Sequence, residues 1–160
     1  MKDFINSIKN PFKFKLFLIS KLPMGLLAGL KISALDEEKC LVTLPYKYLT
    51  KNPFKSIYFA CLSMAAEMST GVLGMMHVIN SKPPVSMLVV GMESKFLKKA
   101  TGKITFECND GKKIAETISS SIKTGQGHTV SALSTGINEE GEKVAEFNIT
   151  WSFKVKKSNG

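Results

Sequence analysis

One carboxylate, Glu67, lies in the middle of a long apolar stretch and is the only charged residue between Lys55 and Lys82. A carboxylate is costly to desolvate unless it is hydrogen-bonded or protonated, so Glu67 either reaches water on one face or lines a site. In a site it could activate water as a general base or attack a substrate directly. Glu67 is therefore our first candidate for catalysis, and an exposed or structurally bonded glutamate is the alternative.

Two further groups of polar residues could contribute to a site. Asn52 lies in a loop upstream of Glu67 and could orient water or a carbonyl oxygen, although Asn also caps loops and helices. Lys95, Lys98 and Lys99 form a cluster, with Lys103 nearby, that could bind phosphate as point charges. A solvated strand end is the alternative for these lysines.

The net charge of +9, from 22 basic and 13 acidic residues, favours an anionic ligand, nucleic acid or a membrane surface, and also suits plain solubility. We find no stripe of alternating aromatic and basic residues, so we do not expect nucleic-acid binding. The N-terminal residues 2–21 are both basic and apolar. They could touch lipid as an amphipathic helix, although a terminal helix packed on the domain is favoured.

The three cysteines, Cys40, Cys61 and Cys108, are widely spaced and contain no CxxC pair. With only two histidines in the chain, we expect no metal site. Three unpaired thiols favour a reduced compartment, and nothing resembles a cleaved secretory signal, so we expect a cytoplasmic protein.

The order of elements predicts an α+β protein with a largely antiparallel sheet. Helices are expected over 3–9 and 13–30, broken near Asn10-Pro11 and Pro23, and one long helix is expected over 56–79. Residues 46–55 are expected to form a loop. Residues 115–122 could form a short helix or an added strand. The expected strands are 31–35, 40–44, 85–96, 102–109, 131–137 and 143–156.

Residues 56–79 are also long enough to span a bilayer. A glutamate in the middle of a span is expensive, and a helix that a sheet wraps on several sides is apolar nearly all round. We therefore favour a long helix in the core of the domain.

This order of elements resembles the hotdog fold, in which a curved antiparallel sheet wraps one long central helix. The chain is similar, from about Leu26 to Val155, to a thioesterase-like hotdog family known as a domain of unknown function. Distant relatives, the phenylacetate-type acyl-CoA thioesterases, carry Asn, five residues, His-Gly-Gly, six residues and Asp. Here Asn52, then Tyr58-Phe59-Ala60, then Glu67 match that spacing without a gap. A second segment, residues 95–102, is similar to the Phe-Leu-Arg-Pro segment of the superfamily.

The resemblance implies a single hotdog domain over 1–160, with 1–25 as an N-terminal helical segment. It implies an acyl-CoA thioesterase in which the main-chain N–H of Phe59 or Ala60 polarises the thioester carbonyl and Glu67 is the base or nucleophile. In that scheme Asn52 orients the reactants and Tyr58 forms a pocket wall. The lysines that would bind coenzyme A are Lys95, Lys98 and Lys99.

The resemblance also implies a homodimer or dimer of dimers, paired edge to edge, with the active site between protomers. Coenzyme A would enter only as part of the substrate, with no other cofactor and no metal. The chain departs from the family pattern where bulky Tyr58 and Phe59 replace His-Gly. The alternative is therefore a non-catalytic protein that binds an acyl thioester or a lipid.

Overall fold

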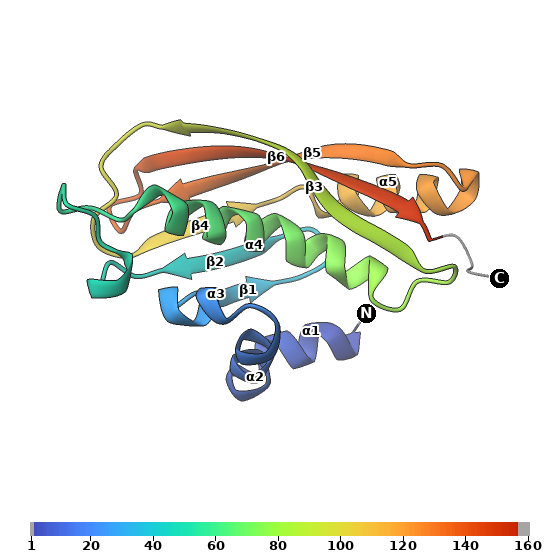
Figure 1. Ribbon diagram of the computed structural model, residues 1–160, viewed down its shortest axis with the longest axis horizontal. Coiled ribbons are helices and arrows are strands. Elements are labelled where there is room, and N and C mark those ends of the chain that lie inside the picture. The colour runs from blue at the N-terminus through green and yellow to red at the C-terminus, as the bar shows by residue number, and fades with distance from the viewer. Residues whose placement is uncertain (1, 157–160) are drawn as a thin grey trace.

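A curved sheet wraps one long helix in the computed structural model, which describes residues 2–156 (Figure 1). The ends of the expected domain, Met1 and residues 157–160, lie outside the described residues. All strand pairs are antiparallel, in the order β1-β2-β4-β5-β6-β3. The strands are β1 (Lys31–Leu35), β2 (Cys40–Leu44), β3 (Val85–Phe96), β4 (Ile104–Cys108), β5 (His128–Ile137) and β6 (Lys143–Val155). The predicted α+β class and antiparallel sheet are confirmed.

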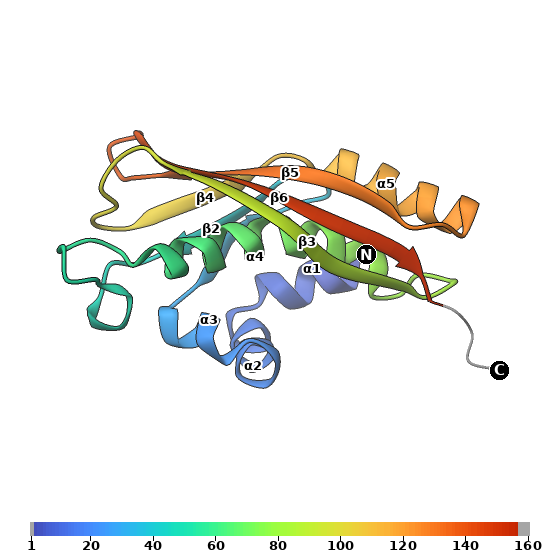
Figure 2. The same ribbon diagram turned by 45° about the horizontal axis from the view of Figure 1, so that its top comes forward.

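Five α-helices accompany the sheet within the described residues. They are α1 (Lys2–Lys9), α2 (Pro11–Lys21), α3 (Pro23–Ala28), α4 (Phe59–Val78) and α5 (Gly111–Thr124), with a short 3-10 helix, η1, at Tyr48–Thr50. The helices α1–α3 lie on the side of α4 opposite β3, β5 and β6 (Figures 1 and 2). Their buried side chains, including Phe14 and Leu18, join the same hydrophobic core as the sheet.

Alternating side chains give the sheet its inner face. In β4, Ile104, Phe106 and Cys108 are fully buried and the residues between them are not. Their Cα partners in β2 are Leu44, Val42 and Cys40, which are buried in the same alternation. Side chains with a period of two point to one face of a strand, so the inner faces of both strands cover the helix.

The central helix α4 is held close to the sheet by two glycines. A Cβ on Gly74 would lie 2.9 Å from Cε of Met87, and one on Gly71 would lie 3.1 Å from Cζ2 of Trp151. This helix is long and apolar enough to cross a membrane, but 67% of that stretch is buried inside the domain. It is therefore the core helix, as predicted, and it begins at Phe59.

The ambiguous segment before β5 is a helix, α5, and covers residues 111–124 rather than the 115–122 considered from the sequence. It packs against β5, β6 and α4. Its first residue, Gly111, donates its N–H to the carbonyl of Glu38 at 3.0 Å, which ties α5 to the turn between β1 and β2. β5 then begins at His128, three residues earlier than expected.

Candidate active site

The loop before α4 is organised by Asn52. Its Oδ1 accepts hydrogen bonds from the N–H groups of Phe54 at 2.9 Å and Ser56 at 3.2 Å. Its Nδ2 donates to Oγ of Ser56 at 3.0 Å and to the carbonyl of Ile57 at 3.3 Å. The amide is thus used on both sides within the loop, which is the capping role that Asn often has in turns.

The start of α4 presents main-chain donors. The helix has Tyr58 as its N-cap, and no side chain hydrogen-bonds there. The first N–H groups of a helix have no acceptor inside the helix, and the helix dipole adds positive potential at this end. The N–H groups of Phe59 and Ala60 therefore have the chemistry that an oxyanion requires.

An open pocket of about 630 Å³ lies at this helix start, and we call it the helix-start pocket. It brings together five of the residues that the sequence proposed. Those five are Asn52, Tyr58, Phe59, Lys98 and Lys99, and further walls come from residues that include Phe54, Leu62, Phe96 and Leu97.

Aromatic rings crowd the helix-start pocket. The rings of Tyr58 and Phe59 meet edge to face with centroids 4.9 Å apart, and Phe59 meets Phe96 in the same way at 6.3 Å. Such edge-to-face pairs are favourable beyond their buried area. Phe96 was missed as a wall because it lies far along the chain, at the end of β3, where only the tertiary fold brings it to α4.

The three lysines differ in their surroundings. Lys98 and Lys99 line the helix-start pocket, whereas Lys95 does not. The Nζ of Lys98 lies 2.6 Å from Oε1 of Glu142, with both side chains about half exposed. An exposed ion pair of this kind is weak, but it partly neutralises Lys98. Lys99 is therefore the better placed of the three for a phosphate at this pocket.

Glu67 lies two turns further along α4 and lines a second pocket of about 280 Å³, which we call the Glu67 pocket. The rest of its lining is apolar. Helix α2 contributes Phe14 and Phe17, with Leu22 directly after it, α4 contributes Met68, Gly71, Val72, Met75 and Val78, and the sheet contributes Met87 and Trp151.

The surroundings of Glu67 favour its neutral form. Burial raises the pKa of the Glu67 carboxyl above its usual value. Among residues 2–156, no side chain or main-chain group hydrogen-bonds to this carboxylate. The nearby polar contacts use other atoms: Nε1 of Trp151 donates to Oγ1 of Thr70 at 2.9 Å, and Thr70 donates to the carbonyl of Glu67 at 3.0 Å. A half-buried acid with a raised pKa is a suitable general base near neutral pH.

Within one chain, the two halves of the expected site do not meet. Phe59 and Glu67 line different pockets. Eight residues of α-helix separate them, which corresponds to about 12 Å along the axis. One thioester group cannot contact both in the same chain, so a site that uses both residues needs a second copy.

The Glu67 pocket has walls that the sequence did not suggest. Phe14 and Phe17 belong to the N-terminal segment, for which the sequence predicts only a terminal helix or a lipid contact. The one available signal was the dense run of aromatic residues in α2.

In the part of the chain that the structure describes, no three His, Cys, Asp or Glu side chains gather as a metal site would require.

Comparison with solved structures gives the fold its name. A protein of unknown function from Pseudomonas aeruginosa, described as a probable thioesterase, matches with a TM-score of 0.77 and 21% identity over 91% of this chain and 97% of that chain. A protein of unknown function from Chlorobaculum tepidum matches with a TM-score of 0.76 and 19% identity over 90% and 93%. A thioesterase from Haemophilus influenzae matches with a TM-score of 0.65 and 15% identity over 91% and 92%.

At these identities the likeness concerns the fold, and it confirms the hotdog fold. No curated protein matches the chain. The family described as Domain of unknown function (DUF4442) matches residues 12–153, which is most of the chain. The protein therefore belongs to this family and has the hotdog fold.

Proposed function

We propose that the protein hydrolyses an acyl thioester, with an acyl-CoA as the substrate and Glu67 as the general base. The observation that carries this proposal is the position of Glu67, a half-buried acid with a raised pKa that faces an apolar pocket on the central helix of a thioesterase-like fold. The acyl chain occupies the Glu67 pocket, and Lys99 binds the phosphates of coenzyme A.

The chemistry needs one water molecule and no further reagent. Glu67 takes a proton from water while the water oxygen bonds to the carbonyl carbon, and the carbonyl electron pair moves to oxygen. That oxygen accepts hydrogen bonds from the N–H of Phe59 or Ala60. When the carbonyl re-forms, the C–S bond breaks and Glu67 passes the proton to sulfur. The products are a carboxylic acid and a free thiol.

The active site is shared between two copies in this proposal, with the helix start of one chain facing Glu67 of the partner subunit. Two observations support it: the separation of Phe59 and Glu67 along one helix, and the unpaired outer edge of β3. The strand β3 pairs with β6 alone in the described part of the sheet, and it leaves Leu88, Val90 and Met92 exposed. A long apolar edge strand needs cover, and pairing with a second β3 supplies it.

The test combines an acyl-CoA panel of increasing chain length with two complementary variants. Glu67→Gln removes the base. Ala60→Pro removes one N–H in the first helical turn, where proline is tolerated. Each variant alone should lose at least about a hundredfold in turnover.

Unfolding and refolding the two variants together should then restore activity. In a shared site, each mixed dimer has one intact site, so a random mixture should recover about a quarter of the wild-type activity. No recovery would show that the helix start of one chain and Glu67 of the partner subunit do not act in one shared site. Wild-type turnover by Glu67→Gln alone would remove the catalytic role of Glu67.

The alternative is a non-catalytic binder of acyl thioesters or lipids. It is favoured by the aromatic rings of Tyr58 and Phe59, which narrow the approach to the helix start, and by the use of the Asn52 amide within its own loop. A binder would show no hydrolysis across the panel, while calorimetric titration would still detect an acyl-CoA site.

We place the protein in the cytoplasm in either case, because its three buried cysteines are free.

A further inference from the structure

Helix α2 has two opposite apolar faces, and only one of them is packed. Phe14 and Leu18, four residues apart, are buried against the domain. Phe12, Leu16 and Ile19, at the spacing i, i+4, i+7, form the opposite face. These three side chains are 77%, 58% and 53% exposed. A surface helix normally carries polar residues on its outer face, so this arrangement calls for a partner.

The apolar surface continues onto α3. Met24 and Leu27 of that helix are also more than half exposed, and Leu22 connects the two helices. We call these exposed side chains the outer stripe: Phe12, Leu16, Ile19, Leu22, Met24 and Leu27.

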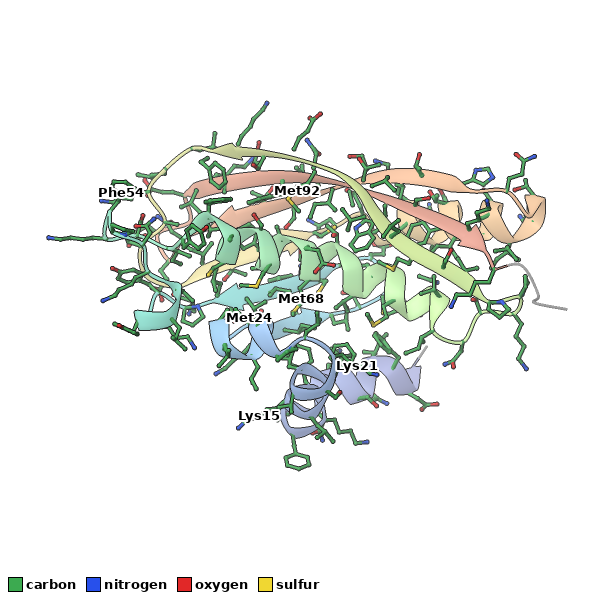
Figure 3. All side chains as sticks on the ribbon, in the orientation of Figure 1. Lys15, Lys21, Met24, Phe54, Met68 and Met92 are labelled. Carbon is green, nitrogen blue, oxygen red and sulfur yellow. The ribbon has the colours of Figure 1, made fainter. Side chains whose placement is uncertain are left out.

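Lysines border the outer stripe. On α2 the helical period places Lys13 on one flank of the stripe and Lys15 on the other. Residues 3–31 contain five lysines and a single acidic residue, Asp3. In Figure 3, Lys15, Lys21 and Met24 all lie on the N-terminal helices, on the side of the molecule away from β3, β5 and β6.

A groove beside the outer stripe is also apolar and bordered by lysines. It lies between α1, α2, α3 and β1, has a volume of about 480 Å³, and is apolar inside with side chains such as Leu18 and Leu26. Its charged lining residues are Lys9, Lys15 and Lys31, and none is acidic. Lys15 borders both the groove and the stripe, so the two features form one surface.

We propose that this surface docks on an anionic lipid bilayer, with the outer stripe in the interface and the lysines on the lipid phosphates. An apolar stripe flanked by lysines is the pattern of helices that lie in the membrane plane. A second copy of the chain is the less suitable occupant, because lysine is depleted in protein–protein interfaces.

The surface also lies next to the candidate active site. Phe14 and Phe17, on the inner side of α2, line the Glu67 pocket. Docking would bring that pocket close to a bilayer in which long acyl chains dissolve. The docking proposal stands independently of hydrolysis, because it rests on the outer side of the same helix.

The test is co-sedimentation of the full chain with vesicles of phosphatidylcholine and with an equal mixture of phosphatidylcholine and phosphatidylglycerol. We expect binding to the mixed vesicles, little binding to the neutral ones, and release as salt screens the charges. Leu16→Ser with Ile19→Ser should weaken binding about tenfold or more. Lys13→Gln with Lys15→Gln should weaken it roughly fivefold per lysine.

Matched controls lie on other surfaces of the molecule. Leu133→Ser removes an exposed leucine of β5, and Lys112→Gln with Lys123→Gln removes two exposed lysines of α5. Both should bind mixed vesicles like the wild type, and circular dichroism should show all variants folded. Three results would overturn the proposal: no binding to mixed vesicles, equal weakening by the controls, or a stripe variant that changes only the mass of the protein in solution. The last would assign the stripe to contact between copies.

Discussion

At the scale of single residues, the raised pKa of Glu67 makes a prediction about stability. The folded chain holds the Glu67 proton more tightly than the unfolded chain, whose carboxyl has a pKa near 4.5. This contribution to stability is therefore complete below pH 4.5 and is lost as pH rises through the folded pKa. Glu67→Gln does not titrate there, so its melting temperature should exceed that of the wild type by more at pH 8 than at pH 4.

Paired thermal melts of the wild type and Glu67→Gln across this pH range check the sign. If the difference in melting temperature between the two proteins stayed constant with pH, the pKa of Glu67 would be the same in the folded protein as in the unfolded chain. Hydrolysis, if Glu67 is the base, should rise with pH through the same pKa, because only the carboxylate accepts a proton.

The lysines of the expected cluster also differ in their expected contribution to binding. Lys99 lines the helix-start pocket, whereas Lys95 of the same expected cluster does not. Lys99→Ala should therefore weaken acyl-CoA binding about fivefold at low salt and leave short pantetheine thioesters unaffected, because those lack the nucleotide phosphates. Lys95→Ala is the matched control and should change neither, as measured by calorimetric titration. If Lys99→Ala changed the binding of acyl-CoA and of pantetheine thioesters equally, the lysine cluster would be a solvated strand end.

Some residues of the site could be found from the sequence and others could not. Glu67 stood out because a lone carboxylate in an apolar helix is a local feature. Phe14, Phe96 and Trp151 were not recognised as pocket walls, since each reaches its pocket only through tertiary packing. The sequence is compatible with both roles of Asn52, and the hydrogen bonds of its side chain within the loop favour the capping role.

At the scale of elements, the edge strand β3 carries the oligomer prediction. Leu88→Lys with Val90→Lys puts two charges on the exposed edge, where they would oppose the pairing of two β3 strands. We expect the dimer to dissociate, as measured by light scattering, with the melting curve of each monomer retained. Ser33→Lys, an exposed site on the opposite edge strand β1, should leave the mass unchanged. A wild-type protein that is already monomeric would contradict the shared site.

The contact between α5 and the turn before β2 gives a second element prediction. A Cβ on Gly111 would lie 2.2 Å from the carbonyl oxygen of Glu37 and 2.7 Å from Cα of Glu38. Backbone atoms cannot move aside as a flexible side chain can, so Gly111→Ala should cost at least about 2 kcal/mol of unfolding free energy. Gly127→Ala, whose nearest neighbour would be 3.7 Å away, should change stability by under about 0.5 kcal/mol in the same denaturant titration. If the two variants lost similar amounts of unfolding free energy, α5 would be able to shift away from the turn without cost.

Strands were easier to predict than α5 for a physical reason. The alternation of apolar and polar residues in the sequence directly predicts the alternating burial of a strand, as in Ile104, Phe106 and Cys108. In α5 the buried Ile114 and Ile118 are four residues apart, which is helical spacing, but the segment is otherwise polar and short. Only its packing against α4 and the sheet decides the conformation.

At the scale of the whole molecule, the order of elements predicted the α+β class and the antiparallel sheet, and its resemblance to the hotdog fold predicted that the sheet wraps the long helix. One long apolar helix between two short strands and four later ones leaves few arrangements that bury the helix, and a wrapped sheet is the simplest. The order of elements could not show that Phe59 and Glu67 line separate pockets, because that depends on the distance between them along α4.

The two-faced helix α2 has a thermodynamic consequence. One helix contributes Phe14 to the wall of the Glu67 pocket and Leu16 to the outer stripe. If filling the pocket shifts α2, membrane affinity and acyl-ligand affinity become linked, and each must change the other by the same factor. We expect anionic vesicles to raise the affinity for a non-hydrolysable acyl-CoA, and that ligand to raise vesicle binding equally, as two independent titrations can measure. Unequal factors would show that a third equilibrium is involved, and factors of one would show that α2 holds its place when the pocket fills. Through such a helix, the protein would bind the bilayer most tightly where the concentration of its acyl ligand is highest.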